Sequence, residues 1–598
     1  MKDKKLPEFR PDAVLTGPSF GNNMARKSTP SSHSPVSETG VIRKDSRGRV
    51  RVGLVFPNTY AVAMANLGFQ AVYALFNARE DVACERFLLP ETPGPIKSLE
   101  SGWPLDQCDI VAFSLSFEND YPNIPAILHQ GGIPFLRENR NKNHPLILAG
   151  GVATFLNPEP LADFFDLFLI GEAEVLTRPF FNLFARYRNL SRKESLCAMA
   201  KEMDGIYAPA FYTPLRNEKG DICGYKTEAG LPEKIKRVFD PHAKNQATCS
   251  VITSPDSAFA DTFLIEVSRG CPHGCRFCSA GFVYRPPRFR NMDVLERAMA
   301  EGKARNMKIG LMGTAVSDLK DIDRICAAAK DGNLVLSFSS LRADALTPAL
   351  LDALVAGGVK TATIAPEAGS PRMRQVINKG LDTPTILEAA EKLVSAGIPN
   401  IRLYFMIGLP EEKPEDITAL KDLVLEIKAR FLEASRLKGY MGSITVGVSP
   451  FVPKPFTPFQ WAAMESENHL KKILKSLRKS FAPVPNVRFH DENPKNSILQ
   501  ALLAKGDRDT SRLITALWQE KGHLARACRS IDFDPGPCLE ARSFGDYLPW
   551  EIIDNGIRRS FLEKEYMKAK KALPTPPCPM KNCEDCGICR EKVPFPPP

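Results

Sequence analysis

The sequence predicts an α/β protein in which a doubly wound parallel sheet precedes a partial barrel of six strands and helices. Short apolar segments that end in glycine or serine alternate with helical stretches, as in sheets of parallel strands. These segments form two separate series along the chain. At 598 residues the chain is also too long for a single core. A mainly helical C-terminal region is expected after the second series.

The chain is expected to begin with a disordered leader. Residues 1–48 are rich in serine, proline and charge, and they have no apolar period. The first residues lack a continuous apolar segment, so no signal peptide is evident. The most apolar stretch, residues 145–171, is interrupted by prolines and acids, so we do not expect it to span a membrane.

The first series begins at residue 50 and predicts a Rossmann-like domain over residues 49–248, although its pattern weakens after residue 175. The expected strands are residues 50–57, 109–116, 145–151 and 167–172. Ligands of such sheets bind beyond the carboxyl ends of the strands. The small residues expected at those ends are Ser114, Ser116, Gly150, Gly151 and Gly171.

The second series predicts a barrel over residues 249–465, whose chemistry would lie at the carboxyl ends of its strands. A helical region over residues 466–572 and a cysteine-rich tail over residues 573–598 would follow. The expected barrel strands are residues 262–267, 309–313, 334–338, 361–365, 401–407 and 444–448.

Three cysteines follow the first barrel strand within eight residues. Cys271, Cys275 and Cys278 have the spacing C-x3-C-x2-C, and Phe277 precedes the last one. Three thiolates on one short loop can each hold one iron of a [4Fe-4S] cube, which leaves the fourth iron without a protein ligand. Three structural or zinc-bound cysteines are the alternative interpretation.

This loop resembles the signature of the radical S-adenosylmethionine (SAM) superfamily. The resemblance implies that Cys271, Cys275 and Cys278 hold a [4Fe-4S] cluster and that Phe277 packs near the adenine of SAM. It also implies that the open iron chelates SAM, and that an electron cleaves SAM to methionine and a 5′-deoxyadenosyl radical. A reductant such as flavodoxin or ferredoxin would supply that electron.

Residues at later strand ends extend the resemblance and are expected to contact the cofactor. An arginine there could pair with the SAM carboxylate, although a surface salt bridge is an equal alternative for it. The turn after the second strand has only one of the usual glycines and no acid. The candidates are Gly313, Thr314, Ser339, Arg342, Glu367 and Gly408.

The N-terminal domain resembles the cobalamin-binding domain that precedes many radical SAM domains. The small strand-end residues named above would let a corrin approach the backbone. The usual Asp-x-His-x-x-Gly motif is missing, and residues 51–69 contain no histidine. Cobalamin bound without a histidine ligand and a structural cap without cobalamin are both compatible with this sequence.

The tail contains a second cysteine cluster, formed by Cys578, Cys583, Cys586 and Cys589. Its C-x2-C-x2-C triplet is typical of ferredoxin-type ligation, so we expect a metal site. An auxiliary Fe–S cluster, a zinc site and free thiols are all compatible with these four cysteines. The proline- and aromatic-rich run 449–461 could line the substrate opening, or serve as a rigid packing loop.

Cysteine content and net charge predict the cellular compartment and the classes of partner. Fifteen cysteines with seven in two tight clusters indicate metal ligation in a reducing cytoplasm rather than a disulfide framework. The net charge of +10 is a mild bias without any Lys/Arg tract, so a nucleic-acid partner has no direct support.

Three functions are compatible with these features. The first is a radical SAM enzyme that uses cobalamin for methylation or a related radical reaction on an unknown substrate. The second is a cobalamin-independent radical SAM enzyme of the methylthiotransferase type that modifies RNA. The third is a non-enzymatic iron–sulfur redox protein or sensor.

Overall fold

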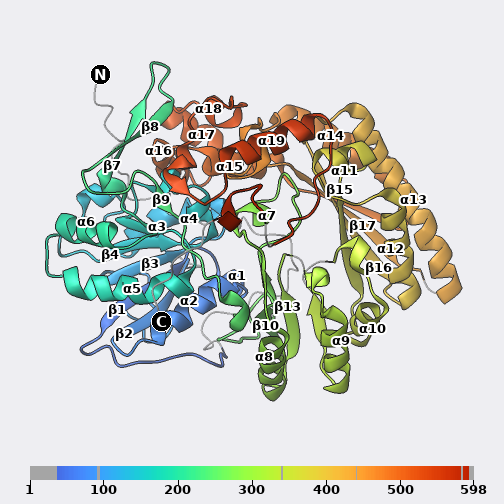
Figure 1. Ribbon diagram of the computed structural model, residues 1–598, viewed down its shortest axis with the longest axis horizontal. Helices are drawn as coiled ribbons and strands as arrows, with labels where there is room; N and C mark the ends of the chain where they lie inside the picture. Colours follow the sequence, from blue (N-terminus) through green and yellow to red (C-terminus); the bar gives the residue numbers. More distant parts are fainter. Residues whose placement is uncertain are drawn as a thin grey trace.

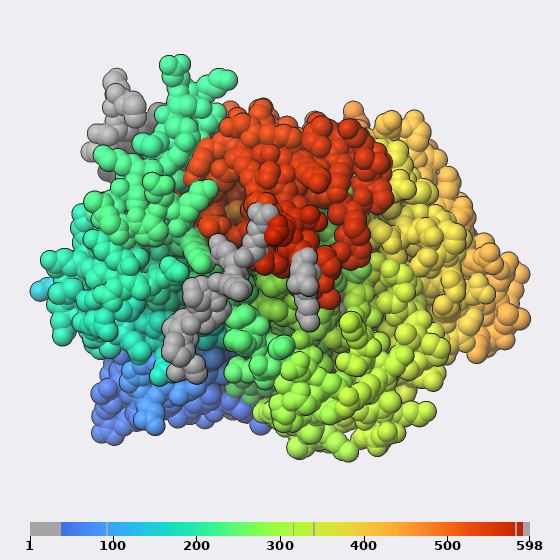
Figure 2. Space-filling model, in the orientation of Figure 1, coloured from blue at the N-terminus to red at the C-terminus, as the bar shows by residue number. Residues whose placement is uncertain are grey.

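The structure is a computed structural model and describes residues 37–90, 94–314, 316–338, 341–439, 441–580 and 583–590. The predicted α/β architecture is confirmed. Figure 1 shows the N-terminal sheet on one side in blue to cyan and the barrel strands on the other in green to yellow. The C-terminal region, in orange to red, lies across the upper side of both, and Figure 2 shows it seated between them.

The N-terminal domain is a six-stranded sheet of order β2-β1-β3-β4-β5-β6, in which only β6 runs antiparallel to its neighbour. Ser114 and Gly150 are paired in register at the carboxyl ends of β3 and β4. The strands are β1 Val50–Phe56, β2 Val82–Leu88, β3 Ile110–Ser114, β4 Leu146–Gly150, β5 Leu167–Leu169 and β6 Ile206–Tyr207. The helices are α1 Tyr60–Met64, α2 Leu67–Asn77, α3 Asn123–Gln130, α4 Val152–Leu156, α5 Ala173–Tyr187 and α6 Arg192–Glu202.

The expected leader is partly folded. Residues 1–36 lie outside the described residues, but residues 37–48 pack against the first domain. Glu38 forms an ion pair of 2.7 Å with Arg86, whose side chain is 1% exposed, and the Ile42 N–H donates to Tyr73. The prediction of disorder is therefore wrong for residues 37–48, because the buried Arg86 side chain needs an acidic partner.

The barrel consists of two parallel sheets, β10-β13-β14 and β15-β16-β17-β18, joined by an isolated parallel bridge between Leu341 and Ile364. All six predicted strands are present, and β18 adds a strand from the region expected to be mainly helical. The strands are β10 Thr262–Glu266, β13 Lys308–Met312, β14 Leu336–Phe338, β15 Thr361–Glu367, β16 Asn400–Ile407, β17 Ser443–Pro450 and β18 Val487–Asp491. The helices are α7 Ala280–Val283, α8 Met292–Ala304, α9 Ile322–Asp331, α10 Pro348–Ala356, α11 Pro371–Val376, α12 Thr383–Ala396 and α13 Pro414–Lys438.

Short strand pairs and helices connect the two domains. Hairpin β7 Tyr212–Arg216 and β8 Ile222–Thr227 precedes β9 Ile235–Lys236, which pairs with β19 Ile553–Asp554; β11 Ser268–Arg269 pairs with β12 Arg288–Phe289. The C-terminal helices are α14 Glu467–Phe481, α15 Pro494–Lys505, α16 Thr510–Gln519, α17 Leu524–Ser530, α18 Gly536–Leu539 and α19 Arg559–Lys570.

Polar contacts attach the C-terminal region to the loops that follow the N-terminal strands. The Asn157 side chain donates to the carbonyls of Ala504 and Gly506 at 2.9 and 2.8 Å. Glu159 forms an ion pair of 3.1 Å with Arg508. Both contacts are largely buried, so they fix the position of the region over the sheet. No helix among the described residues combines the length and apolarity needed to cross a bilayer.

Candidate active site

The three cysteines of the signature lie on the loop between β11 and α7, beyond the carboxyl end of the first barrel strand. Cys275 is buried, and Cys271 and Cys278 are half-buried. Burial raises the pKa of Cys271 to about 12 and that of Cys275 to about 11. These thiols therefore lose their protons only when a cation such as a metal ion binds to the sulfur atoms.

The start of the loop is anchored to the neighbouring strand end. Gly270 has φ +82°, and a Cβ there would lie 2.7 Å from the carbonyl oxygen of Tyr284, so the position requires glycine. The Thr314 hydroxyl donates to the Gly270 carbonyl at 2.7 Å. His273 Nε2 lies 2.6 Å from a carboxylate oxygen of Asp318. Thr314 thus shapes the loop that carries the cysteines.

The Arg276 side chain fastens the middle of the loop and is fully buried. Its guanidinium donates to the carbonyls of Gln375 and Val376 at 2.9 and 2.8 Å. It also donates to the Leu573 carbonyl and forms an ion pair of 3.1 Å with Glu565. One side chain thereby connects the cysteine loop, the end of α11 and the C-terminal region.

A half-buried ion pair lies beside the cysteines. Glu367 ends β15 in the left-handed region, with φ +67°, and Lys379 Nζ lies 3.1 Å from its carboxylate. Burial opposes the charge of Lys379, but Glu367 and then Cys275 hold its pKa above the usual value. A non-glycine residue in this conformation is strained, which is common at binding sites. Sequence reasoning named Glu367 and missed Lys379, which no motif marks.

The other residues predicted to contact the cofactor near the loop differ in whether their polar groups already have partners. Arg342 is paired with Asp344 at 2.8 Å and lies 3.8 Å from Asp318, so the ion-pair alternative describes its state. A Cβ on Gly313 would lie 2.6 Å from the hydroxyl of Ser268. That hydroxyl is buried and has no hydrogen-bond partner among the described residues. Ser339 lies outside them.

A buried hydroxyl that has no hydrogen-bond partner, next to a glycine without a side chain, is a suitable place for a polar group of a cofactor. Ser268, in β11 just after β10, and Gly313, directly after β13, meet this description, and β10 and β13 are neighbouring strands. The residues therefore fit SAM near the cysteine loop, and the three thiols fit a cluster with one open iron. Sequence reasoning missed Ser268, which stands three residues before Cys271.

Phe277 belongs to the cysteine loop, and Gly408 directly follows β16. Phe277 packs against an apolar cluster that includes Leu409 and the half-buried Met406. Gly408 has φ +72°, and its N–H donates to the Glu412 carboxylate at 2.9 Å. Burial raises the pKa of Glu412 to about 7. Glu412 therefore supports the turn after β16, and no sequence motif marks it.

The five small residues of the N-terminal sheet serve different purposes. Gly151 has φ +108°, and a Cβ there would lie 2.3 Å from the Leu115 carbonyl oxygen. Gly171 approaches Val238 in the same way, at 2.1 Å. Packing within the fold thus requires both of these glycines, and no ligand is needed to explain them.

Ser114, Ser116 and Gly150 are half-buried and remain accessible. The Ser116 hydroxyl accepts a hydrogen bond from Asn66 at 3.1 Å. A Cβ on Gly150 would meet only the Leu169 carbonyl, at 3.7 Å. These residues leave small, open backbone at the carboxyl ends of adjacent strands, which fits a flat ligand such as a corrin.

The tail cysteines lie near one another. Burial raises the pKa of Cys589, and the thiols of Cys586, Cys578 and Cys583 raise it further, while Arg285 lowers it. In the part of the chain that the structure describes, no three or more His, Cys, Asp or Glu side chains are placed to hold a single metal ion.

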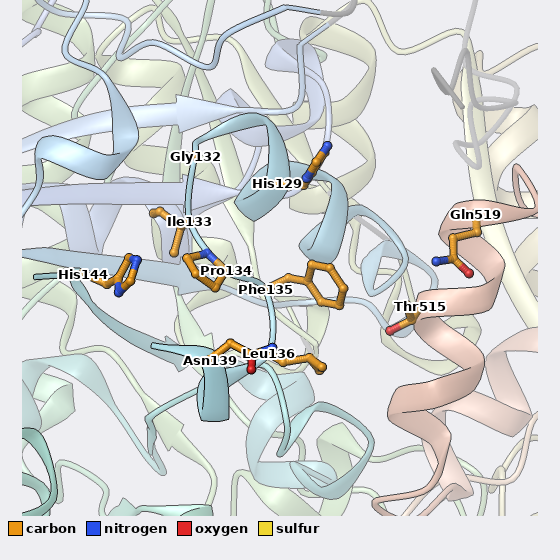
Figure 3. Close-up of a pocket in the computed structure, with 10 residues that line it drawn as sticks. All are labelled: His129, Gly132, Ile133, Pro134, Phe135, Leu136, Asn139, His144, Thr515 and Gln519. Carbon is orange, nitrogen blue, oxygen red and sulfur yellow. The ribbon is translucent and has the colours of Figure 1, made fainter. Parts of the chain in front are cut away.

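A separate hollow of about 520 Å³ lies beside the loop that leads to the amino end of β4. Figure 3 shows it between the loop that leads from α3 to β4, with Phe135, and helix α16, with Thr515 and Gln519. It is remote in the fold from the carboxyl ends of the strands, so we do not assign it to the cofactors.

Comparisons with known proteins bear on both domains. Residues 265–424 match the family model described as "Radical SAM superfamily", and residues 68–209 match "Radical SAM proteins, N-terminal". The first match includes the cysteine loop, and the second includes β3, β4 and β5.

Three curated relatives have similar sequences. An uncharacterized protein of Methanocaldococcus jannaschii is 29% identical over 77% of this chain and 90% of its own length. An uncharacterized methyltransferase of Pyrococcus horikoshii is 27% identical over 26% of this chain and 35% of that protein. Bacteriochlorophyllide d C-12(1)-methyltransferase of Chlorobaculum tepidum is 23% identical over 35% of this chain and 49% of that enzyme.

Two solved structures are similar at low sequence identity. The radical SAM methyltransferase TsrM of Kitasatospora setae, with tryptophan and a SAM analogue bound, has a TM-score of 0.48 and 13% identity over 80% of this chain and 100% of that one. The cobalamin-dependent SAM radical enzyme OxsB has a TM-score of 0.39 and 12% identity over 88% of this chain and 84% of that one.

Proposed function

Because the chain belongs to the radical SAM superfamily and is therefore an enzyme, we propose that it reductively cleaves SAM and uses cobalamin in a methylation or related radical reaction. The observation that supports this most is the anchored loop of Cys271, Cys275 and Cys278 beside a half-buried ion pair at the barrel mouth.

The residues of the chain have distinct tasks in this proposal. The three thiols hold a [4Fe-4S] cluster, which when bound supplies the electron that splits SAM. Ser268 and the backbone at Gly313 receive a polar group of SAM, and Phe277 covers its apolar part. Lys379 and Glu367 keep a fixed pair of charges beside the cysteines. The C-terminal region shields the outer side of the loop from water, which strengthens these interactions.

Cobalamin is proposed for the accessible carboxyl ends of β3 and β4. Ser114, Ser116 and Gly150 offer small, half-buried contacts there. Two of the curated relatives are named as methyltransferases, which agrees with a methyl-transfer reaction. The chain itself contributes no histidine from the β1 loop, so any axial ligand would come from elsewhere.

The experiment is anaerobic turnover of reconstituted protein with dithionite and SAM, with 5′-deoxyadenosine measured by mass spectrometry. The wild type is expected to form it, and Cys275→Ala is expected not to. Cys223→Ala is the matched control, since Cys223 is exposed on β8. An intact cluster without any SAM cleavage would contradict the proposed activity.

Cobalamin is tested separately, by retention of hydroxocobalamin through gel filtration. The wild type should retain it, and Gly150→Leu should lose it, because a side chain there extends into the accessible face. Cleavage of SAM without retained cobalamin would instead favour the cobalamin-independent type of enzyme. Gly150→Leu that still binds cobalamin would show that the corrin site lies elsewhere.

A further inference from the structure

The tail runs beside the cysteine loop and is hydrogen-bonded to it. The Cys578 N–H donates to the carbonyl of Pro272 at 2.7 Å, next to Cys271. Asn378 bridges the two segments, because its amide donates to the carbonyls of Gly274 and Thr575, both at 3.1 Å. The Thr575 N–H donates back to Asn378 at 2.8 Å. We call residues 573–580 the strap.

Side chains reinforce the contact between the strap and the loop. The Arg276 guanidinium donates to the Leu573 carbonyl at 2.7 Å and pairs with Glu565 of α19. The Thr575 hydroxyl donates to the same carboxylate at 2.8 Å. The strap therefore begins where α19 ends and continues directly over the cysteine loop.

The tail then returns to the beginning of α19. The Cys586 carbonyl accepts a hydrogen bond of 2.9 Å from the N–H of Arg558, the residue before that helix. Cys586 is 5% exposed. The chain thus runs from one end of α19 back to the other, with Cys578, Cys583 and Cys586 along this path and Cys589 just beyond it.

A cation lies beside the tail cysteines. Cys589 lies within electrostatic reach of Cys578, Cys583 and Cys586 and of Arg285. The Arg285 guanidinium lies over the rings of Phe282 and Phe561, at 5.0 and 5.2 Å from their centroids. A cation held in this way stabilises negative charge nearby, and metal–thiolate centres carry such charge.

We propose that Cys578, Cys583, Cys586 and Cys589 bind a metal through their thiolates, and that this second centre fastens the strap over the cysteine loop. Metal binding supplies folding free energy to short segments that have little core of their own. The strap would then restrict opening of the loop and loss of its cluster. This inference rests on the proposed function, because the fastened loop is the one proposed to hold the catalytic cluster. An iron–sulfur cluster spans separated thiols, whereas zinc would require the four thiols to draw together around one ion, since the described side chains are not placed to hold a single metal ion. The test distinguishes the two.

The test uses full-length protein purified anaerobically, with iron and zinc measured per chain. Cys589→Ser is the main variant, because Cys589 is exposed and its loss should leave the fold intact; Cys586→Ser is the second variant, and Cys223→Ser is the control. We expect the tail variants to lose either about one zinc or about four irons per chain relative to the control. Unchanged metal content in both variants would overturn the metal site.

The fastening is measured by hydrogen exchange over residues 270–279 and by the rate at which a chelator removes iron from the loop. Both should be at least tenfold faster in Cys589→Ser than in the control. Loss of the tail metal without either change would overturn the fastening.

A variant without Cys271, Cys275 and Cys278 separates this inference from the proposed function. It should retain the metal of the tail while it loses the cluster of the loop. Loss of the tail metal in this variant would show that the two sites are not distinct.

Discussion

Replacing Arg276 by methionine tests whether this side chain holds the cysteine loop closed. The guanidinium is fully buried, with an ion pair to Glu565 and hydrogen bonds to three carbonyls. Removing one partner of a buried ion pair costs about 3–5 kcal/mol. Lys568 and Thr575 still contact Glu565 in the variant, so the lower end of that range is expected.

The assay is amide hydrogen exchange over residues 270–279 of the otherwise unchanged protein. A cost of about 3 kcal/mol corresponds to roughly 100-fold faster exchange through local opening. Arg297→Met is the matched control. Its ion pair with Asp293 is exposed on α8, so a change below about 0.5 kcal/mol is expected. Exchange of the loop within about threefold of the wild type in Arg276→Met would refute the reasoning.

Two further predictions concern the N-terminal sheet. Gly151→Ala should lower the thermal midpoint, since its Cβ would meet the Leu115 carbonyl at 2.3 Å, while Gly150→Ala should leave it nearly unchanged; equal effects would contradict the packing argument. Burial raises the pKa of Asp120 to about 7, so the folded state retains a proton that the unfolded state loses above about pH 4. The contribution of the Asp120 carboxyl to the free energy of unfolding is largest below pH 4. It falls by at most about 1.4 kcal/mol per pH unit up to about pH 7. Asp120→Asn should therefore flatten the stability profile between pH 4 and 7; an unchanged slope in denaturant titrations would contradict this.

The sequence predicted most strands because their apolar runs are uninterrupted. Strand β2 was missed, since Glu85 and Arg86 stand in the middle of Val82–Leu88 although the whole strand is buried. Their charges are compensated by residues from outside the strand, including Glu100, which lies 2.6 Å from Arg86. Such compensation depends on the tertiary structure and leaves no local pattern.

The residues of the candidate site also divide into those that a local motif predicts and those that only the tertiary structure brings together. The cysteine loop is a local motif, so its residues could be named from spacing alone. Lys379 and Asn378 contact the loop from about 100 positions away in the sequence, and the Asn378 contact spans 104 residues. Glu565 reaches Arg276 across 289 residues. No periodicity or spacing records contacts of this range, so they became visible only in the fold.

The most direct test of the central claim is electron paramagnetic resonance of the reduced, reconstituted protein with and without SAM. The proposed loop leaves one iron without a protein ligand, so SAM should bind there and shift the cluster signal. The shift should persist in Cys589→Ser, whose loop keeps all three cysteines, and Cys275→Ala should lose the SAM-dependent shift. A wild-type cluster signal that SAM leaves unchanged would contradict the claim that the loop of Cys271, Cys275 and Cys278 is a SAM-binding iron site.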